Sequence, residues 1–216
     1  MPDRPPVKGA PYSAQVVAEI TQTLADGTRI THSTYSRLYR DSEGRERCEE
    51  TSDSIFKGIF ISDPVEPAGY SLDLGRKVAT RTIGQERVGK EMRGAVVRFV
   101  QAHPTDSAPE KGSKITGHMN PEEQLGTRMI EGISAIGTRT TVVGLDGQIN
   151  NVNERWISPD LHIALLMTAS NSVWGPITYR LMNIIRGEQP RALFEVPTDY
   201  KIVSPYRVQM LEINRK

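Results

Sequence analysis

The sequence has almost no cysteine, no long hydrophobic run and almost no net charge. Cys48 is the single cysteine, so the chain forms no internal disulfide and gives no signal of a redox compartment. No stretch of about 18 apolar residues occurs, so no membrane-spanning helix is predicted. The net charge of +1 at pH 7 argues against non-specific electrostatic binding of nucleic acid, because such binding needs a surplus of basic residues.

Familiar catalytic and metal-binding motifs are also missing. The sequence contains no Gly-x-Ser-x-Gly, His-Glu-x-x-His or Cys-x-x-Cys motif. The histidines lack the short spacing of zinc ligands, so we predict no metal and no cofactor. They are His32, His103, His118 and His162. Cys48 lies beside Arg47, which could lower the thiol pKa, but we interpret Cys48 as an ordinary strand residue.

The length and composition indicate a globular chain. Its 216 residues fit one all-β domain, and 37% hydrophobic with 25% charged residues is typical of folded proteins. We predict a flexible N-terminal arm at residues 1–11 and a single domain at residues 12–216. No signal peptide follows Met1. The chain is therefore either an exported protein whose signal has been removed or a cytoplasmic protein with a loose N-terminus.

The segment Glu154–Ile185 organises the predicted fold. Apolar and other residues alternate along it with period two, on both sides of an Asn/Ser/Gly turn, which predicts two long antiparallel strands at the centre of the sheet. Leu166, Met182 and Ile184 are apolar on the face where a half-exposed sheet would carry polar residues. This pattern indicates either a sheet covered on both faces or one face open to an apolar ligand.

Turn signals divide the rest of the chain into short strands. Residues 12–24 fit a helix or a strand, and the Asp26-Gly27 turn that follows favours a hairpin. The first 82 residues therefore read as a β-meander, and two further strands are joined through Ser134-Ala135. Residues 84–122 form an irregular or partly helical insert across the open side, either a lid or a disordered excursion. We predict a mainly β fold, a strongly curved antiparallel sheet of about eight to eleven strands.

Several segments together resemble a known group of proteins. They are DGTRI, LYRDSEGRERCEE, IFISDPVEPAGYSLDLGRKVATR, EQLGTRMIEGISAIGTRTT, ERWISPDL and ALFEVPTDYKI. Over residues 12–202 they resemble an uncharacterised family of exported bacterial proteins, and their order resembles the LolA-like lipoprotein-carrier superfamily. That resemblance implies an unclosed β half-barrel, an exported or periplasmic location, and a role in carrying acyl chains, sensing envelope proteins or steering a reactive indole intermediate. Unlike the carriers, this chain shows no clear long amphipathic helices that would plug the half-barrel.

Candidate functional residues fall into three sets. The ligand-binding candidates are Trp156, Leu166, Trp174, Met182 and Ile184, for which core packing is the alternative. The weak acid–base candidates are His162, Glu154 and Tyr179. A charged ladder is interpreted as cross-strand pairing on a wet face, or as a polar rim for an acidic head group. It consists of Arg37, Arg40, Asp41, Glu43, Arg45, Arg47, Glu49 and Glu50.

Three functions fit these residues. The first, which we favour, is a non-enzymatic cell-envelope protein that holds an apolar ligand, such as an acyl chain or lipid, in the concave face. The second is an enzyme that uses the same cavity to orient a reactive aromatic or acyl substrate. The third is a sensor that recognises another envelope protein through a sheet edge. Converging polar groups would favour the enzyme, a dry apolar cavity the carrier, and a filled core with one exposed edge the sensor.

Overall fold

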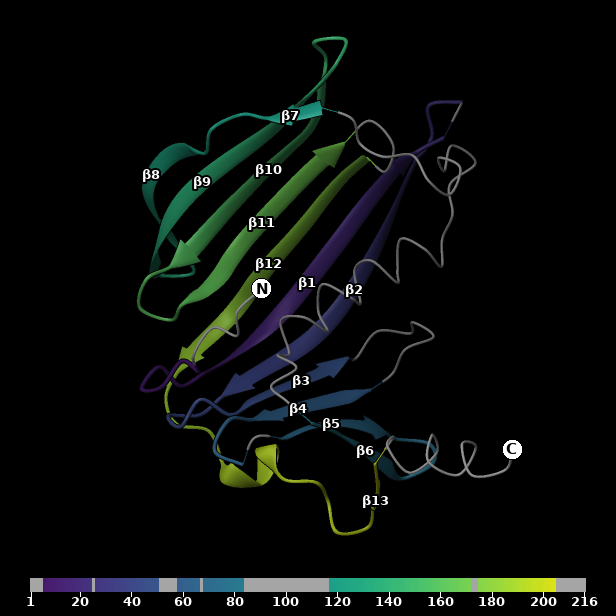
Figure 1. Cartoon of the computed structure of the whole chain (residues 1–216), viewed down its shortest axis with the longest axis vertical. Helices are drawn as coiled ribbons and strands as arrows, with labels where there is room; N and C mark the ends of the chain where they lie inside the picture. The colour runs from purple at the N-terminus through teal and green to yellow at the C-terminus, as the bar shows by residue number, and fades with distance from the viewer. Residues whose placement is uncertain are drawn as a thin grey trace, which may run out of the picture. The chain divides into compact units, whose positions relative to one another are not determined.

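A computed structural model describes residues 6–24, 26–50, 58–66, 68–83, 117–171 and 175–204 (Figure 1). These residues form strands and one short 3-10 helix. The strands are β1 (Tyr12–Thr23), β2 (Arg29–Arg40), β3 (Glu46–Glu50), β4 (Ile59–Asp63), β5 (Ala68–Asp73), β6 (Val78–Ile83), β7 (Gly117–Met119), β8 (Glu123–Ile130), β9 (Ile133–Gly144), β10 (Ile149–Ser158), β11 (Ile163–Asn171), β12 (Gly175–Arg186) and β13 (Lys201–Val203). The 3-10 helix η1 spans Arg191–Phe194.

All thirteen strands belong to one hydrogen-bonded sheet. Its order is β13-β6-β5-β4-β3-β2-β1-β12-β11-β10-β9-β7, and β8 also pairs with β9. The strands with resolved pairing are antiparallel, except that β13 runs parallel to β6. The predicted fold class, a mainly β chain built on one open sheet, is confirmed, but the predicted count of eight to eleven strands is too low, since the described residues form thirteen. No helix in the described part of the chain is long and apolar enough to cross a membrane.

Short acidic turns end many of these strands, as the sequence predicted. Asp63 Oδ1 accepts hydrogen bonds from the backbone N–H groups of Val65 and Glu66, at 2.8 and 3.1 Å. Asp73 Oδ1 accepts the N–H groups of Gly75 and Arg76 in the same way, both at 2.9 Å. Such side-chain bonds stabilise a turn locally because they replace the backbone partner that the strand ladder no longer supplies.

Two turn positions differ from the prediction. The turn before β9 lies at Glu131-Gly132, not at Ser134-Ala135, because both turn residues have positive φ, 49° and 73°. Positive φ at both central residues is the requirement of a type I′ hairpin turn. In the Glu154–Ile185 segment, residues 159–162 form a turn that separates β10 from β11. The segment therefore holds the last part of β10 in addition to the two strands of the hairpin, β11 and β12. The β11–β12 hairpin is interior to the sheet.

By its internal contacts the chain divides into two compact units. Unit 1 comprises residues 1–14, 36–94 and 185–216, and unit 2 comprises residues 15–35 and 95–184. In unit 1, η1 inserts Phe194 into a core with Ile61, Leu72 and Ala79, all of them buried. This core lies on β4, β5 and β6, so the meander is closed by a residue from the C-terminal part of the chain.

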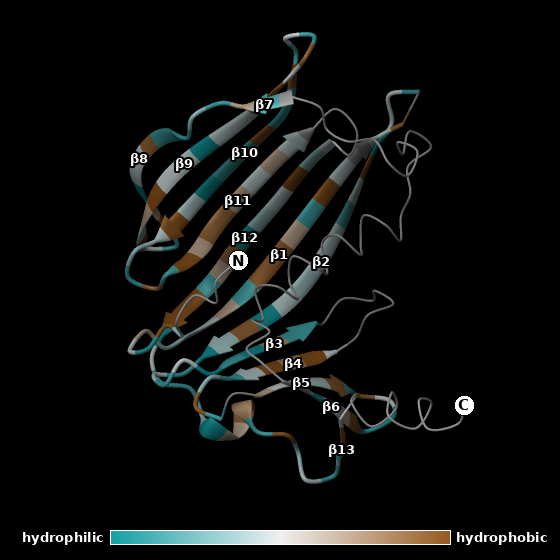
Figure 2. Ribbon diagram, viewed as in Figure 1, coloured by the Kyte–Doolittle hydropathy of each residue, from teal (hydrophilic) through white to brown (hydrophobic). Residues whose placement is uncertain are grey.

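Unit 2 contains β7 to β11, most of β12 and parts of β1 and β2. Figure 2 shows hydrophobic and hydrophilic residues interleaved along its strands, as alternating inward and outward side chains require. Its buried hydrophobic residues are Val16, Ile133, Ala135, Trp156, Leu161, Leu165, Tyr179 and Leu181. The apolar alternation of the Glu154–Ile185 segment thus supplies five of these eight residues.

Some predictions concern residues outside the described ranges, and one is not tested by the structure. Most of the 84–122 insert lies outside them, although Gly117–Met119 at its end forms β7. Trp174 and residues 1–5 also lie outside. Residues 6–11 are placed beside the 41–44 turn, where the Gly9 N–H donates to the Ser42 carbonyl at 2.9 Å. The single domain at residues 12–216 stays a prediction.

Leu165 tests the position of the β11–β12 hairpin. Its side chain is fully buried, so Leu165→Asp would bury a charge without a partner. We expect this variant to lose about 3 kcal/mol or more of unfolding free energy, measured by thermal and urea denaturation. The control Ile149→Asp, at a residue that is 63% exposed, should change stability little. A soluble Leu165→Asp protein with an unchanged melting temperature would contradict the assigned burial.

Candidate ligand-binding face

Two neighbouring rows of residues define one face of unit 2, named here the Trp156 face. Residues directly opposite each other in an antiparallel ladder project their side chains to the same side. The first row is Gly126, Gly137, Trp156, Leu166 and Arg180. The second row is Glu123, Arg139, Glu154, Thr168 and Thr178. The two rows are two residues apart along β9, β10, β11 and β12, so they share a face.

The indole of Trp156 lies across β9 at Gly137. A Cβ atom added to Gly137 would approach three ring atoms of Trp156 to 2.6–2.7 Å, a distance that real side chains do not tolerate. Glycine at this position therefore allows the indole to lie flat on the neighbouring strand. The guanidinium carbon of Arg128, on β8, lies 3.8 Å from the centre of the ring. Arg128 thus covers the indole in a cation–π arrangement.

Trp156 is buried but incompletely hydrogen-bonded. Only 7% of the residue is exposed, and its indole Nε1 finds no hydrogen-bond partner among the described residues. A buried N–H donor without a partner costs on the order of 1–3 kcal/mol. Buried polar groups are generally satisfied in proteins, so an unpartnered donor at this position is informative.

A charged row borders the indole. The Arg139 guanidinium donates to Glu154 Oε1 at 2.7 and 2.9 Å and to Glu123 Oε2 at 3.0 Å. These three residues lie directly opposite each other on β8, β9 and β10. The hydrogen bonds with Glu154, and then with Glu123, raise the pKa of Arg139, so its guanidinium stays protonated. Arg139 is therefore paired with two carboxylates within the face, so this row has one more negative than positive side chain.

Half-buried apolar side chains continue the face away from the indole. Leu166 lies directly opposite Trp156, and Val152 and Met182 occupy the same face four residues before Trp156 and two residues after Arg180. Asn183 has φ 52°, and its N–H donates to Glu131 Oε2 at 3.1 Å. This left-handed residue interrupts the alternation, which therefore no longer assigns Ile184 to the face of Leu166 and Met182.

The three acid–base candidates do not share one face. Glu154 lies on the Trp156 face and is held by Arg139. Tyr179 is opposite Met167, one position along from the Leu166–Arg180 pair, so it points to the other face and is buried. His162 is exposed in the turn before β11, where its N–H donates to the Ser158 carbonyl at 2.8 Å. The strand register does not bring these three residues together.

Neither Cys48 nor a cluster of metal ligands provides a reactive centre among the described residues. Burial raises the pKa of the Cys48 thiol to about 12, with the carboxylates of Glu50 and Glu49 contributing. The thiol therefore stays protonated and unreactive at neutral pH, in agreement with its interpretation as an ordinary strand residue. Among the described residues, no group of three or more His, Cys, Asp or Glu side chains could hold a metal ion.

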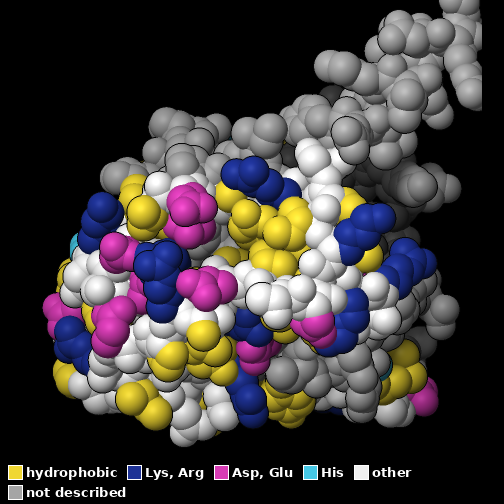
Figure 3. Space-filling model, turned by 90° about the horizontal axis from the view of Figure 1, so that it is seen from below, with side chains coloured by type: hydrophobic (Ala, Val, Ile, Leu, Met, Phe, Trp, Pro, Cys, Tyr) yellow, Lys and Arg dark blue, Asp and Glu magenta, His cyan; other side chains and the backbone are white. Residues whose placement is uncertain are grey.

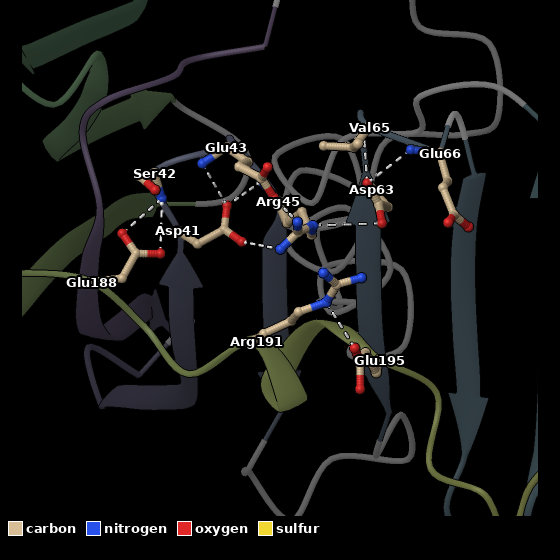
Figure 4. A network of polar contacts seen from close by, with 10 residues as sticks. All are labelled: Asp41, Ser42, Glu43, Arg45, Asp63, Val65, Glu66, Glu188, Arg191 and Glu195. Carbon is tan, nitrogen blue, oxygen red and sulfur yellow. Dashed lines mark hydrogen bonds and ion pairs between the residues drawn. The ribbon is translucent and has the colours of Figure 1, made fainter.

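Part of the charged ladder, around Arg45 and Asp41, forms a buried network in unit 1 (Figure 4). Arg45 donates to Asp41 Oδ2 at 2.7 Å, also contacts Glu43, and lies 3.7 Å from Asp63. The side chains of Arg45 and Asp41 are only 8% and 2% exposed. The interpretation as wet-face pairing is therefore wrong for these two residues, because the turn at residues 41–44 folds their side chains inward.

Arg40 fixes the chain that precedes β1. Its guanidinium donates to the carbonyl of Ala10 at 2.8 and 3.0 Å and stacks on the ring of Tyr12 at 4.8 Å. Burial raises the pKa of Tyr12, which stays a neutral phenol. Figure 3 shows basic and acidic side chains interspersed with hydrophobic ones on the described surface seen from below. That mixture agrees with the small net charge of the chain.

The comparisons with known proteins give similarities of fold. No protein-family model matches the sequence, and no curated protein matches it. An uncharacterized conserved protein from Thermus thermophilus is 11% identical, with 90% of each chain covered and a TM-score of 0.49. A LolA superfamily protein from Nitrosomonas europaea is 6% identical, covering 88% of this chain and 92% of that chain, with a TM-score of 0.41. The lipoprotein LppX from Mycobacterium tuberculosis is 13% identical, covering 86% of this chain and 89% of that chain, with a TM-score of 0.34. The open sheet of this chain agrees with the unclosed sheet that the sequence resemblance implied.

Two residues that contact the indole on the Trp156 face were not among the sequence candidates. Gly137 and Arg128 become significant only through the register that sets them against Trp156. A possible sequence signal was the glycine within an otherwise regular strand pattern, which often marks a close approach of another group. Arg128 carried no such signal, because an arginine on an edge strand is common.

Gly137→Ala tests the contact between Gly137 and the indole. The added methyl group would overlap the Trp156 ring, so we expect a loss of about 1–3 kcal/mol and a changed Trp156 fluorescence spectrum in a Trp174→Phe background. Gly75→Ala is the control, because its added Cβ meets only an ordinary contact at 3.5 Å. Equal stability and identical spectra for the two variants would contradict the close approach.

Arg45→Ala tests the buried network. Removing the guanidinium leaves the buried Asp41 carboxylate without its ion-pair partner, which should cost about 3–5 kcal/mol in unfolding free energy. Arg191→Ala is the matched control, because it breaks the exposed Arg191–Glu195 pair, whose side chains are 74% and 59% exposed. That change should cost less than about 1 kcal/mol. Similar losses in the two variants would show that the Arg45 network is not buried in solution.

Proposed function

We propose that this chain is a non-enzymatic cell-envelope protein that binds the apolar part of a lipid-like ligand on the Trp156 face. The observation that supports this function is the direct opposition of Trp156 and Leu166 on β10 and β11. Half-buried Val152 and Met182 extend the same face. The sequence resemblance to exported bacterial proteins supports the envelope location.

The affinity would come from apolar contact. Burial of apolar surface contributes about 25 cal/mol per Å², so a ligand chain that loses roughly 300 Å² to this face would gain on the order of 7 kcal/mol before ordering costs. Unbranched apolar side chains suit such a ligand, and Met182 adapts to irregular shapes. Leu166 and Met182 are half-buried and so keep part of their surface for contact, whereas Trp156 is only 7% exposed and supports them from beneath.

The enzyme alternative has less support from the geometry. Acid–base catalysis needs a group within hydrogen-bond reach of the proton that it transfers. Glu154 is held by Arg139, whereas Tyr179 and His162 lie away from the Trp156 face. These candidates give no common position for a substrate.

A protein-interaction module is supported by one observation of its own. Strand β8 pairs with β9 alone among the described strands, so its other edge carries backbone groups that an added strand could pair with. The register shift between Gln124 and Gly126 disrupts that edge, and such bulges hinder strand addition. The ligand-binding function is therefore the better supported of the two.

Leu166→Ser tests the proposed function through two paired measurements, thermal melting and titration with a fluorescent fatty-acid analogue. Leu166 is half-buried, so the change should lower stability only modestly, by about 1 kcal/mol, and should weaken probe binding about tenfold. Ile149→Ser, on the exposed start of β10, should leave both properties nearly unchanged.

The outcomes separate a binding face from a packed core. A loss of several kcal/mol in Leu166→Ser, within the range of about 2–5 for truncating a buried aliphatic side chain, would place Leu166 in the core. If the parent protein also fails to bind the probe, the proposed function is wrong.

A further inference from the structure

We propose that the Trp156 face also carries an oxyanion site, formed by the Arg128 guanidinium and the Trp156 indole N–H, that binds the acidic head group of the ligand. This inference rests on the proposed function and specifies its ligand as an anionic amphiphile with one apolar chain. Two independent features of the face support it: an arginine without a carboxylate partner among the described residues and a buried N–H without an acceptor there.

Arg128 differs from the other arginines of this face in its charge balance. Arg139 is bound by Glu154 and Glu123, and Arg180 donates to Glu19 at 2.9 Å. Arg128 is exposed and makes no ion pair with any described residue; its contact is with the ring of Trp156. Arg128 is therefore the one arginine of these three that has no carboxylate partner among the described residues.

Stacking prepares the Arg128 side chain for an anion. One flat side of the guanidinium lies against the indole, which orients the side chain. The N–H groups point outward along the edge of the guanidinium plane, where stacking does not use them. Those N–H groups match the two oxygens of a carboxylate or phosphate. The ring beneath supplies apolar surface, which suits the junction between a head group and an acyl chain.

The unpartnered indole N–H adds a second donor. Nε1 belongs to the ring that Arg128 covers, and it is enclosed in this structure. A ligand oxygen would reach Nε1 after side chains around the indole shift, while Arg128 keeps its stacked position. The bond would then satisfy a buried donor that now has no acceptor among the described residues. Arg128 and Trp156 together thus favour an oxyanion over a neutral group.

The test compares two ligands of equal chain length on the full chain. Dodecanoate carries a carboxylate and dodecan-1-ol carries a neutral hydroxyl group, and each displaces the fluorescent fatty-acid analogue in a competition titration. Acetate and inorganic phosphate are added as free anions without a chain. The parent protein should bind dodecanoate about 10- to 100-fold more tightly than dodecan-1-ol, the range expected for hydrogen bonds to a charged group.

Arg128→Gln should bring the ratio of the two affinities, dodecanoate over dodecan-1-ol, close to one. The matched control is Arg155→Gln, because Arg155 is also exposed but precedes Trp156 by one residue and lies on the opposite face of β10. The control should keep the full preference. In a Trp174→Phe background, dodecanoate should also shift the Trp156 emission, a response that a merely stabilising role for Arg128 would not produce.

The other outcomes overturn separate parts of the proposal. Equal affinities for the two amphiphiles, unchanged in Arg128→Gln, would refute the oxyanion site and leave the apolar binding face intact. Binding of acetate or phosphate as tightly as dodecanoate would show that the site serves a free anion, so the lipid head group would be the wrong ligand. If neither amphiphile binds, the proposed function fails and the head-group site fails with it.

Discussion

The backbone hydrogen-bond register across neighbouring strands is the constraint on which the described structure depends. It decides which side chains share a face, because opposite residues in an antiparallel ladder project to the same side. In unit 2 it sets Glu123, Arg139 and Glu154 in one line across three strands. The same register sets Gly137, Trp156 and Leu166 in the next line. A shift of one residue would place Trp156 on the other face, beside different neighbours.

The candidate site shows how a small residue can create a surface for a large one. Because Gly137 has no Cβ, the Trp156 indole can lie on β9, and the Arg128 guanidinium of β8 lies over the ring. The charged Glu123–Arg139–Glu154 line borders this arrangement and holds one more negative than positive side chain. The result is an apolar face in which Arg128, beside the aromatic residue, has no carboxylate partner among the described residues, a combination that suits an amphiphile better than a purely apolar molecule.

Unit 1 uses charged residues in a different way. Arg45 and Asp41 are buried together, and Arg40 is buried against the carbonyl of Ala10. Buried ion pairs contribute little net stability relative to well-packed apolar residues, but they tolerate the loss of one partner poorly. The network therefore fixes the geometry of the 41–44 turn and of the chain before β1. It is not available as a polar rim for an acidic head group.

Local patterns in the sequence determined the class of the fold and most of its strands. Period-two alternation and Asp-Gly turns act over a few residues, so β1 to β6 and the β11–β12 hairpin were predictable from the sequence. The same patterns identified Trp156 and Leu166 as ligand candidates. Only the tertiary structure decided that they are opposite each other, that Arg128 and Gly137 complete their surroundings, and that Arg45 and Asp41 are buried. Those facts depend on strand register and turn geometry, which join residues far apart in the chain and leave no local pattern in the sequence.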